Sequence, residues 1–231
     1  MGDAGRPRLL DLFCGAGGCS MGYHRAGFDV TGVDLNPQPN YPFEFIQADA
    51  MTYPLEGFDA YAGSPPCEGF TQMSARWRGK GTKADTYPDL LTPTLARFRQ
   101  LSAPWVIENV QGAVHHMRAT LTLHGGMFGL GVHRPRLFES NVLLLIPKAP
   151  ACKQPIGVYG TKPDGRTTYR YRNNGNYKGK SLIRAAKSVE EAREVMGIDW
   201  MTWDEIRNAI PPAYTEFIGH QLIGYLTERA A

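Results

Sequence analysis

The sequence has few cysteines and no long hydrophobic run. Its four cysteines, Cys14, Cys19, Cys67 and Cys152, are scattered through 231 residues without paired spacing, so a disulfide framework is not expected. No apolar run reaches the roughly 18 residues that a membrane-spanning helix needs. A positively charged segment followed by an apolar one is also missing near the N-terminus. These absences predict a cytosolic protein with no part in a membrane.

The sequence also lacks a metal pattern and a strong net charge. Its six histidines show no zinc-binding spacing, and Cys14 with Cys19 has no second pair, so no metal is expected. The net charge of +3 is too small to indicate a nucleic-acid partner by itself. Its distribution is uneven, however, because residues 149–187 contain nine lysines and arginines against one aspartate. This short segment therefore concentrates positive charge.

Short apolar runs alternate with helix-like segments through the first two thirds of the chain. The expected strands are 8–13, 28–33, 43–47, 58–62, 105–108 and 136–146. The expected helices are a segment ending at Ala26, then 90–101, 114–123, 189–196 and 213–226. Such alternation is typical of an α/β fold, with a Rossmann-like, doubly wound and mostly parallel sheet.

The composition changes after Pro147, where Gly, Lys, Arg, Asn and Tyr replace most apolar residues. We therefore expect a main α/β domain of residues 1–147 that is completed by a C-terminal segment, 206–231. Residues 148–205 would form a small basic subdomain. The amphipathic helix expected within the C-terminal segment would pack back onto the sheet.

A glycine-rich turn, Cys14-Gly15-Ala16-Gly17-Gly18, follows the first expected strand. Glycines let the backbone approach a ligand closely, and the N-terminus of the next helix favours polar or anionic groups. Asp34, at the end of the second strand, is placed to accept hydrogen bonds from ribose hydroxyls. NAD is less favoured because Ser20 occupies the place of the third fingerprint glycine. Taken alone, the pattern fits a nucleoside cofactor and a purely structural turn equally well.

Cys67 follows Gly63-Ser64-Pro65-Pro66 at the end of an expected strand. A free cysteine is usually a small buried hydrophobe, but a polar, basic and glycine-containing segment follows this one. A thiolate is a strong nucleophile. Cytosine C5 accepts a methyl group only after a nucleophile has added to C6, with N3 protonated and O2 held. Glu108 would contact N3 and Arg136 would place positive charge near O2.

In these motifs the chain resembles the DNA cytosine-5 methyltransferases that depend on S-adenosylmethionine. The matching segments are Asp11–Gly18, Gly63–Cys67, Glu108–Val110, Arg134 with Arg136, Glu191 with Met196-Gly197, and Asn208–Pro212. The resemblance implies that the catalytic residues are Cys67, Glu108, Arg134 and Arg136. It implies that S-adenosylmethionine is bound by Phe13, Gly15, Gly17, Asp34, Asp49, Pro65 and Asn208. Asp49 would bond the adenine amino group, although a lone carboxylate there also fits a solvated loop. It further implies a bacterial or phage-encoded enzyme.

Three motifs and one length depart from the family pattern. Glu68 stands where glutamine usually follows the nucleophile, Val132 and His133 replace the glutamine of the arginine motif, and Arg207 replaces a glycine. Only 55 positions separate Arg136 from Glu191, so the target-recognition region is much reduced.

The DNA contacts are expected in two places, a loop at 70–83 that would act as wedge and lid, and the basic segment. The candidates are Arg76, Arg78, Lys80, Arg170, Arg172, Lys178 and Lys180. Arginine and asparagine read base edges, whereas lysines bind phosphates; a merely solvated basic loop is the alternative. We expect the partner to be double-stranded DNA whose target cytosine is flipped out. RNA cytosine-5 methylation and a catalytically silent DNA-binding relative remain alternative interpretations.

Overall fold

The computed structural model describes residues 5–71, 79–82, 86–118, 121–148, 155–160, 162–171 and 181–230. Within these residues the largest unit is a seven-stranded sheet in the order β3-β2-β1-β4-β5-β7-β6. The strands are β1 (Arg8–Leu12), β2 (Asp29–Asp34), β3 (Glu44–Gln47), β4 (Ala60–Gly63), β5 (Trp105–Asn109), β6 (Leu121–Leu123) and β7 (Arg136–Ser140). β3, β2, β1, β4 and β5 pair in parallel, while β7 is antiparallel to both β5 and β6. The expected doubly wound, mostly parallel sheet is thus confirmed.

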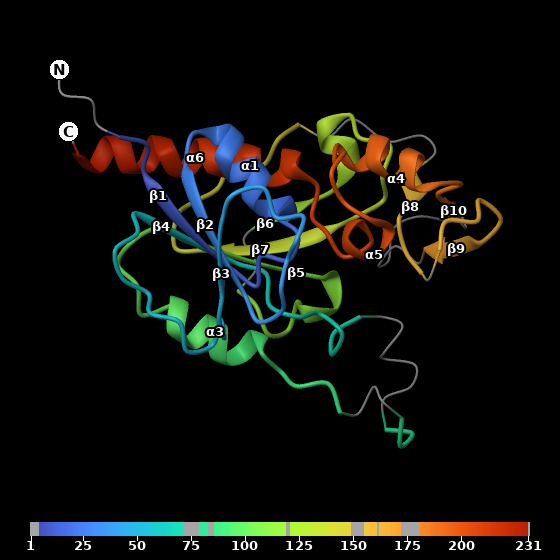
Figure 1. The fold of residues 1–231 in the computed structure, drawn as a ribbon, viewed down its shortest axis with the longest axis horizontal. Helices are drawn as coiled ribbons and strands as arrows, with labels where there is room; N and C mark the ends of the chain where they lie inside the picture. The colour runs from blue at the N-terminus through green and yellow to red at the C-terminus, as the bar shows by residue number, and fades with distance from the viewer. Residues whose placement is uncertain are drawn as a thin grey trace.

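Helices cover both faces of this sheet (Figure 1). α1 (Gly18–Ala26) and α6 (Pro212–Ala230) lie on one face, and α3 (Leu91–Phe98) lies on the other. The alternation of side chains along β1 explains why both faces are apolar. Leu9 packs with the α1 and α6 side chains, and Leu10 and Leu12 pack with the α3 side chains. Asp11 interrupts the apolar pattern on the α1 face and is fully buried there.

α1 and α6 pack at very close range, which requires a glycine between them. A Cβ placed on Gly22 would lie 2.2 Å from the Pro212 carbonyl oxygen and 2.0 Å from the Thr215 hydroxyl. The Thr215 hydroxyl also donates to the Cys19 carbonyl at 2.8 Å. The helix that we expected to return to the sheet therefore docks directly on the helix after the glycine-rich turn.

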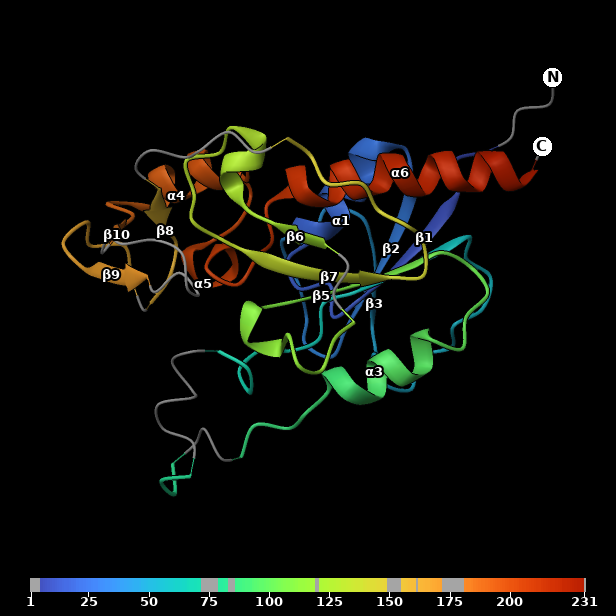
Figure 2. The same cartoon turned by 180° about the vertical axis from the view of Figure 1, so that it is seen from behind.

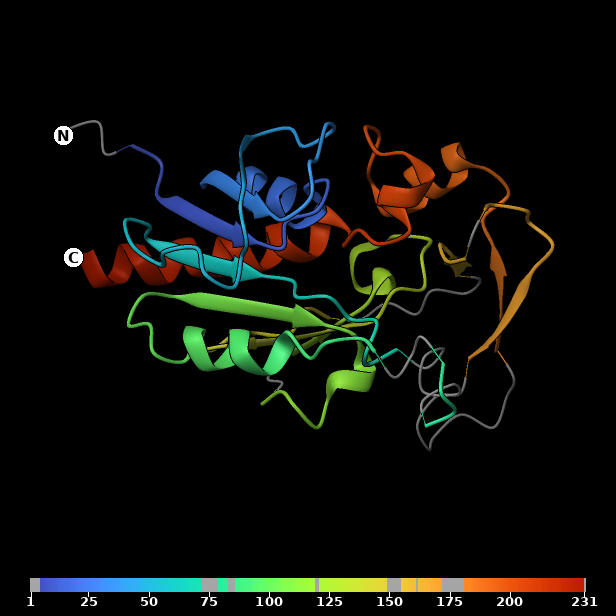
Figure 3. The same ribbon diagram turned by 60° about the horizontal axis from the view of Figure 1, so that its bottom comes forward.

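A second, three-stranded sheet lies at the end of the molecule opposite the two chain termini (Figures 2 and 3). Its strands are β8 (Ile156–Gly157), β9 (Thr168–Tyr171) and β10 (Ser181–Ala185), in the order β8-β10-β9. α4 (Val189–Met196) and α5 (Trp203–Ile206) accompany it. These elements fall in and around the segment 148–205 that we assign to a separate subdomain, and that division stays a prediction.

One expected element is wrong and another is too long. The described residues of the segment 114–123 form no helix: a 3-10 turn, η2 (Gln111–Ala113), precedes the segment and its last three residues form β6. Leu121 and Leu123 are buried while Thr122 between them is exposed, and this period of two suits a strand that pairs with β7. The expected strand 136–146 ends at Ser140, because the Asn141 side chain accepts from the Trp105 amide and donates to the Ala103 carbonyl. No helix among the described residues is long and apolar enough to cross a membrane.

Candidate active site

The candidate catalytic residues meet at one edge of the large sheet. β1, β4 and β5 are parallel neighbours, so their carboxyl ends lie side by side. The glycine-rich turn follows β1, the segment leading to Cys67 follows β4, and Glu108 lies near the end of β5. Arg136 reaches the same edge from the other direction, because it opens the antiparallel strand β7.

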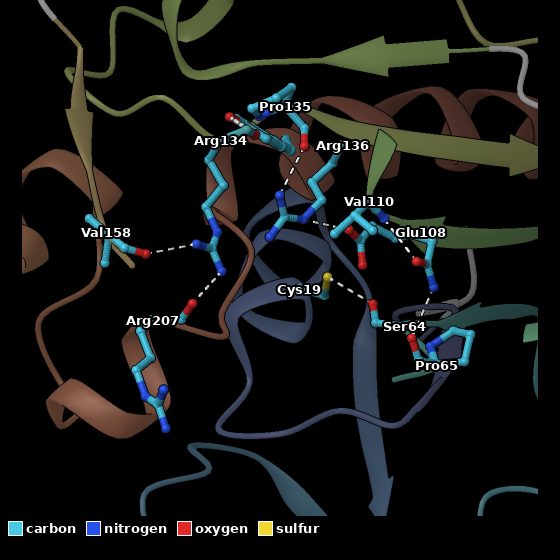
Figure 4. Close-up of polar contacts among 12 residues, drawn as sticks. Cys19, Ser64, Pro65, Glu108, Val110, Arg134, Pro135, Arg136, Val158 and Arg207 are labelled. Atoms are coloured by element: carbon cyan, nitrogen blue, oxygen red, sulfur yellow. Dashed lines mark hydrogen bonds and ion pairs between the residues drawn. The ribbon is translucent and has the colours of Figure 1, made fainter. Parts of the chain in front are cut away.

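Glu108 and Arg136 form a buried ion pair (Figure 4). Arg136 Nε lies 2.8 Å from Glu108 Oε1, and their side chains are only 10% and 9% exposed. The contact lacks hydrogen-bond geometry, because Oε1 has no hydrogen-bond partner among the described residues. Burial raises the pKa of Glu108, while Arg136, Arg134 and a hydrogen bond from Ser64 lower it in part. A larger fraction of this carboxyl therefore carries a proton near neutral pH than in an exposed glutamate.

Cys67 lies within the field of this pair. Burial raises the pKa of its thiol, Arg136 opposes that rise, and Glu108 and Glu68 add to it. Cys67 as a residue is partly exposed, unlike the buried Cys14 and Cys19. The structure thus brings Cys67, Glu108 and Arg136 into one cluster, as the sequence motifs predicted. Their chemical roles stay a prediction.

Asn109 fixes the corner that precedes Cys67. Its amide nitrogen donates to the Pro65 carbonyl at 3.0 Å, and its amide oxygen accepts from the Val110 N–H at 2.9 Å. Asn109 is 1% exposed, so these hydrogen bonds are shielded from water. Pro65 is itself buried. The residue next to Glu108 in sequence therefore ties the end of β5 to the Ser-Pro-Pro corner.

The turn that starts at Cys67 packs against the η2 backbone. The Phe70 N–H donates to the Cys67 carbonyl at 2.8 Å, which closes the turn. A Cβ on Gly112 would lie 1.8 Å from the Phe70 carbonyl oxygen, far inside van der Waals contact. The Phe70 ring also meets the His116 ring with centroids 4.8 Å apart. Gly112 is a residue that the sequence reasoning missed, although a glycine three positions after Asn109 was a visible signal.

Arg134 is close to the cluster but directs its guanidinium elsewhere. Its two terminal nitrogens donate to the carbonyls of Val158 and Arg207, at 3.1 and 2.8 Å (Figure 4). It is 1% exposed, and burial lowers its pKa to about 10. The sequence reasoning grouped Arg134 with Arg136, yet the two arginines have different partners.

The glycine-rich turn bends through the left-handed region at Phe13, Gly15 and Gly17, with φ values of 58°, 49° and 85°. Asp34, at the end of the neighbouring strand, accepts the Gly15 N–H on Oδ2 at 3.1 Å and the Asn36 N–H on Oδ1 at 3.0 Å. A Cβ on Gly15 would meet no atom within 4 Å, so open space lies beside the turn. The turn and Asp34 are thus joined, and their common role in binding a cofactor stays a prediction.

Asp11 is a second residue that the sequence reasoning left out of the site. It is fully buried, its Oδ2 accepts from the Ser20 hydroxyl at 2.6 Å, and Oδ1 has no hydrogen-bond partner within the described part of the chain. Burial raises its pKa to about 7, and the charges of Asp34 and Glu108 add to the rise. The available signal was a charged residue inside the apolar run Leu9–Leu12. A buried carboxyl rarely lacks hydrogen-bond partners, so its presence in such a run is unusual.

Two predicted cofactor contacts have exposed side chains with local partners. Asp49 accepts the Met51 N–H on Oδ1 at 2.8 Å, and Asn208 donates to the Asp204 carbonyl at 3.0 Å. Among the predicted DNA contacts, Lys80 is exposed. The backbone of Arg170 lies in β9, opposite Leu182 of β10. The other five, Arg76, Arg78, Arg172, Lys178 and Lys180, lie outside the described residues. Over the described ranges, no group of three or more His, Cys, Asp or Glu residues could hold a metal ion.

No protein-family model and no curated protein matches the chain. Solved structures do match it over nearly its whole length. One is a prophage-encoded protein of E. coli assigned as a DNA modification methyltransferase, with 16% identity, a TM-score of 0.61, and coverage of 96% of this chain and 99% of that one. The S. pombe Dnmt2 methyltransferase has 14% identity and a TM-score of 0.58 over the same shares.

The Entamoeba histolytica methyltransferase EhMeth has 12% identity and a TM-score of 0.55, covering 98% of this chain and 99% of that one. The chain shares the fold of these methyltransferases. The resemblance that the motifs indicated is therefore confirmed for the fold, and the match leaves no large part of the chain outside it.

Proposed function

We propose that this chain transfers a methyl group from S-adenosylmethionine to C5 of cytosine in DNA. The buried Glu108–Arg136 ion pair beside Cys67 is the observation on which this function mainly rests. A nucleophile, a carboxyl group with a raised pKa and a fixed guanidinium are the three groups needed to activate the cytosine ring.

Each residue would act on a different atom of the base. The Cys67 thiolate adds to C6, and the electron pair of the C5–C6 bond moves toward C5. Glu108 donates a proton to N3, which its raised pKa favours, and Arg136 stabilises negative charge on O2. Once C5 has been methylated, it loses its proton to water, and the C5–C6 double bond forms again as the C6–S bond breaks. Cys67 leaves as the thiolate, and N3 returns its proton to Glu108.

The residues of the glycine-rich turn fit S-adenosylmethionine. Open space beside Gly15, the Asp34 carboxylate at the turn, and the partnerless oxygen of buried Asp11 suit a nucleoside with a cationic tail. Phe13, Gly15, Gly17 and Asp34 would hold the cofactor, which supplies an electrophilic methyl group when it is bound. Asp49, Pro65 and Asn208 stay weaker candidates for contacts with the cofactor. The side chains of Asp49 and Asn208 are exposed.

DNA is the favoured substrate because one matched structure of the same fold is assigned as a DNA modification methyltransferase. Flipping a cytosine out of the duplex costs a few kcal/mol, which contacts from the basic segment and from the loop after Cys67 would offset. We propose the cytoplasm of a bacterium, with a host or phage gene, as the place of action.

The proposal is tested by assaying methyl transfer to duplex DNA and to folded RNA side by side, with Cys67→Ala as the inactive control. The host DNA is then sequenced after expression, by a method that reports 5-methylcytosine and its context. We expect transfer to DNA and one short methylated site. Methyl transfer to RNA alone would show that RNA, and not DNA, is the substrate. Binding of DNA without methyl transfer would indicate a catalytically silent DNA-binding protein.

A further inference from the structure

Arg134 joins three parts of the chain that are distant in sequence. It lies just before β7, and its two terminal nitrogens reach the Val158 carbonyl after β8 and the Arg207 carbonyl after α5 (Figure 4). Its own carbonyl accepts from the Tyr214 hydroxyl of α6 at 2.9 Å. Full burial of a guanidinium is costly unless its donors are used. The two terminal nitrogens of Arg134 are used, whereas its Nε has no hydrogen-bond partner among the described residues. The fork geometry of the side chain is suited to holding two carbonyls at a fixed separation.

The backbone just before Arg134, at residues 131–133, forms the seam between the two sheets. The His133 N–H donates to the Ile156 carbonyl at 2.8 Å, and the Ile156 N–H donates to the Gly131 carbonyl at 2.7 Å. Val132 and Ile156 form a parallel bridge. β8 in turn pairs with β10. The three-stranded sheet therefore meets the catalytic unit through the residues immediately before Arg134.

The aromatic side chain of Tyr159 also contacts Arg134 and the residue before it. The Arg134 guanidinium carbon lies 5.8 Å from the centre of the Tyr159 ring, and the Tyr159 hydroxyl bonds to the His133 carbonyl. Cation–π contact of this kind is strongest in sites without water. Arg134 is thus held by one residue of the small sheet region while it holds the carbonyl of Val158.

We propose that Arg134 is a positioning residue that fixes the three-stranded sheet relative to Cys67, Glu108 and Arg136. This inference rests on the proposed function, in which the sheet carries part of the DNA contacts. Arg136 follows Arg134 by two residues. One short segment therefore carries both the arginine that contacts the small sheet region and the arginine that pairs with Glu108. DNA bound to the small sheet is thereby presented to the active site at one distance and one angle.

The test compares Arg134→Lys with the wild type in steady-state kinetics on DNA. A lysine ammonium cannot span both carbonyls with a planar fork. We expect KM for DNA to rise about tenfold or more, as for one lost hydrogen bond from a charged group, with kcat close to that of the wild type. Arg99→Lys is the matched control, because Arg99 also makes a bidentate contact, in its case with the buried Glu139.

Hydrogen exchange supplies a readout that is independent of the chemistry. In Arg134→Lys, the amides of residues 155–160 and 181–186 should exchange faster than in Arg99→Lys, and those of β1 and β5 should not. A fall in kcat with unchanged KM would make Arg134 catalytic and overturn the proposal. Equal kinetics and equal exchange in both variants would show a merely stabilising role and also overturn it. If the wild type itself transfers no methyl group, the proposed function fails, and the exchange pattern still decides whether Arg134 fixes the sheet.

Discussion

Arg136 Nε lies 2.8 Å from Glu108 Oε1, and each side chain is about nine-tenths buried. Removing water strengthens the attraction between the two charges and their electrostatic effect on the Cys67 thiol. Glu108 Oε1 has no hydrogen-bond partner among the described residues, so the ion pair is the contact that holds it.

The reactivity of Cys67 should depend on Arg136. Burial raises the pKa of this thiol and Arg136 is the largest influence that lowers it. Arg136→Gln should therefore move the thiol pKa further upward and slow alkylation by iodoacetamide at any pH below that pKa. The rate is measured for the Cys67 peptide by mass spectrometry across a pH series, with Arg99→Gln as the control. A lower pKa of the Cys67 thiol in Arg136→Gln would contradict this electrostatic influence.

Gly112→Ala should impair methyl transfer without loss of cofactor affinity. The new Cβ would lie 1.8 Å from the Phe70 carbonyl oxygen, so the turn from Cys67 to Phe70 must move. A displacement of about 1 Å in a reacting group costs on the order of a hundredfold in rate. Gly224→Ala on α6 is the control, since its Cβ would meet no atom within 4 Å. Equal single-turnover rates in the two variants would show that Gly112 does not position Cys67.

The parts that sequence predicted well are those in which one local pattern decides the outcome. Asp34 and Cys67 each end a short apolar run, and the parallel sheet then brings such ends to one edge. The strand Leu121–Leu123 was mistaken for helix because three residues are too few to show a period, and its partner β7 comes later in the chain. The three-stranded sheet was not predicted, since its two-residue strand β8 depends on pairing with β10.

The site was less predictable where a residue acts through a tertiary contact. Arg134 and Arg136 stand two positions apart, and only the fold shows that one holds carbonyls while the other pairs with Glu108. Gly112 follows Asn109 by three positions, but only the fold shows that the Phe70 backbone lies against it.

Asp34→Ala should weaken binding of S-adenosylmethionine by about 1–3 kcal/mol, the scale for hydrogen bonds to a charged group. Part of the loss would come from the turn itself, because Asp34 also accepts the Gly15 N–H. Titration calorimetry measures the affinity, and Glu44→Ala at the edge strand β3 serves as the control. Unchanged affinity in Asp34→Ala would remove Asp34 from the cofactor site.

Asp11 should make the stability of the cofactor-free protein depend on pH. Its pKa is raised from 3.8 to about 7 in the folded chain, mainly by burial. The folded state therefore binds this proton more tightly than the unfolded state. The contribution of the Asp11 proton to folding stability is complete below about pH 4 and is lost as the pH rises through about 7. In urea unfolding from pH 4 to 8, the stability of the wild type relative to Asp11→Asn should fall with rising pH. A constant difference would contradict the raised pKa.

The covalent step is the central claim, and it can be trapped directly. Duplex DNA made with 5-fluorocytosine at every cytosine is incubated with the protein and S-adenosylmethionine, and the products are separated under denaturing conditions. Fluorine cannot leave as a proton does, so the account predicts a stable protein–DNA complex whose peptide map places the link at Cys67. Cys67→Ala should form none while it still binds DNA and cofactor. An active wild-type protein that yields no covalent complex, or one linked through another residue, would contradict the attack of Cys67 on C6.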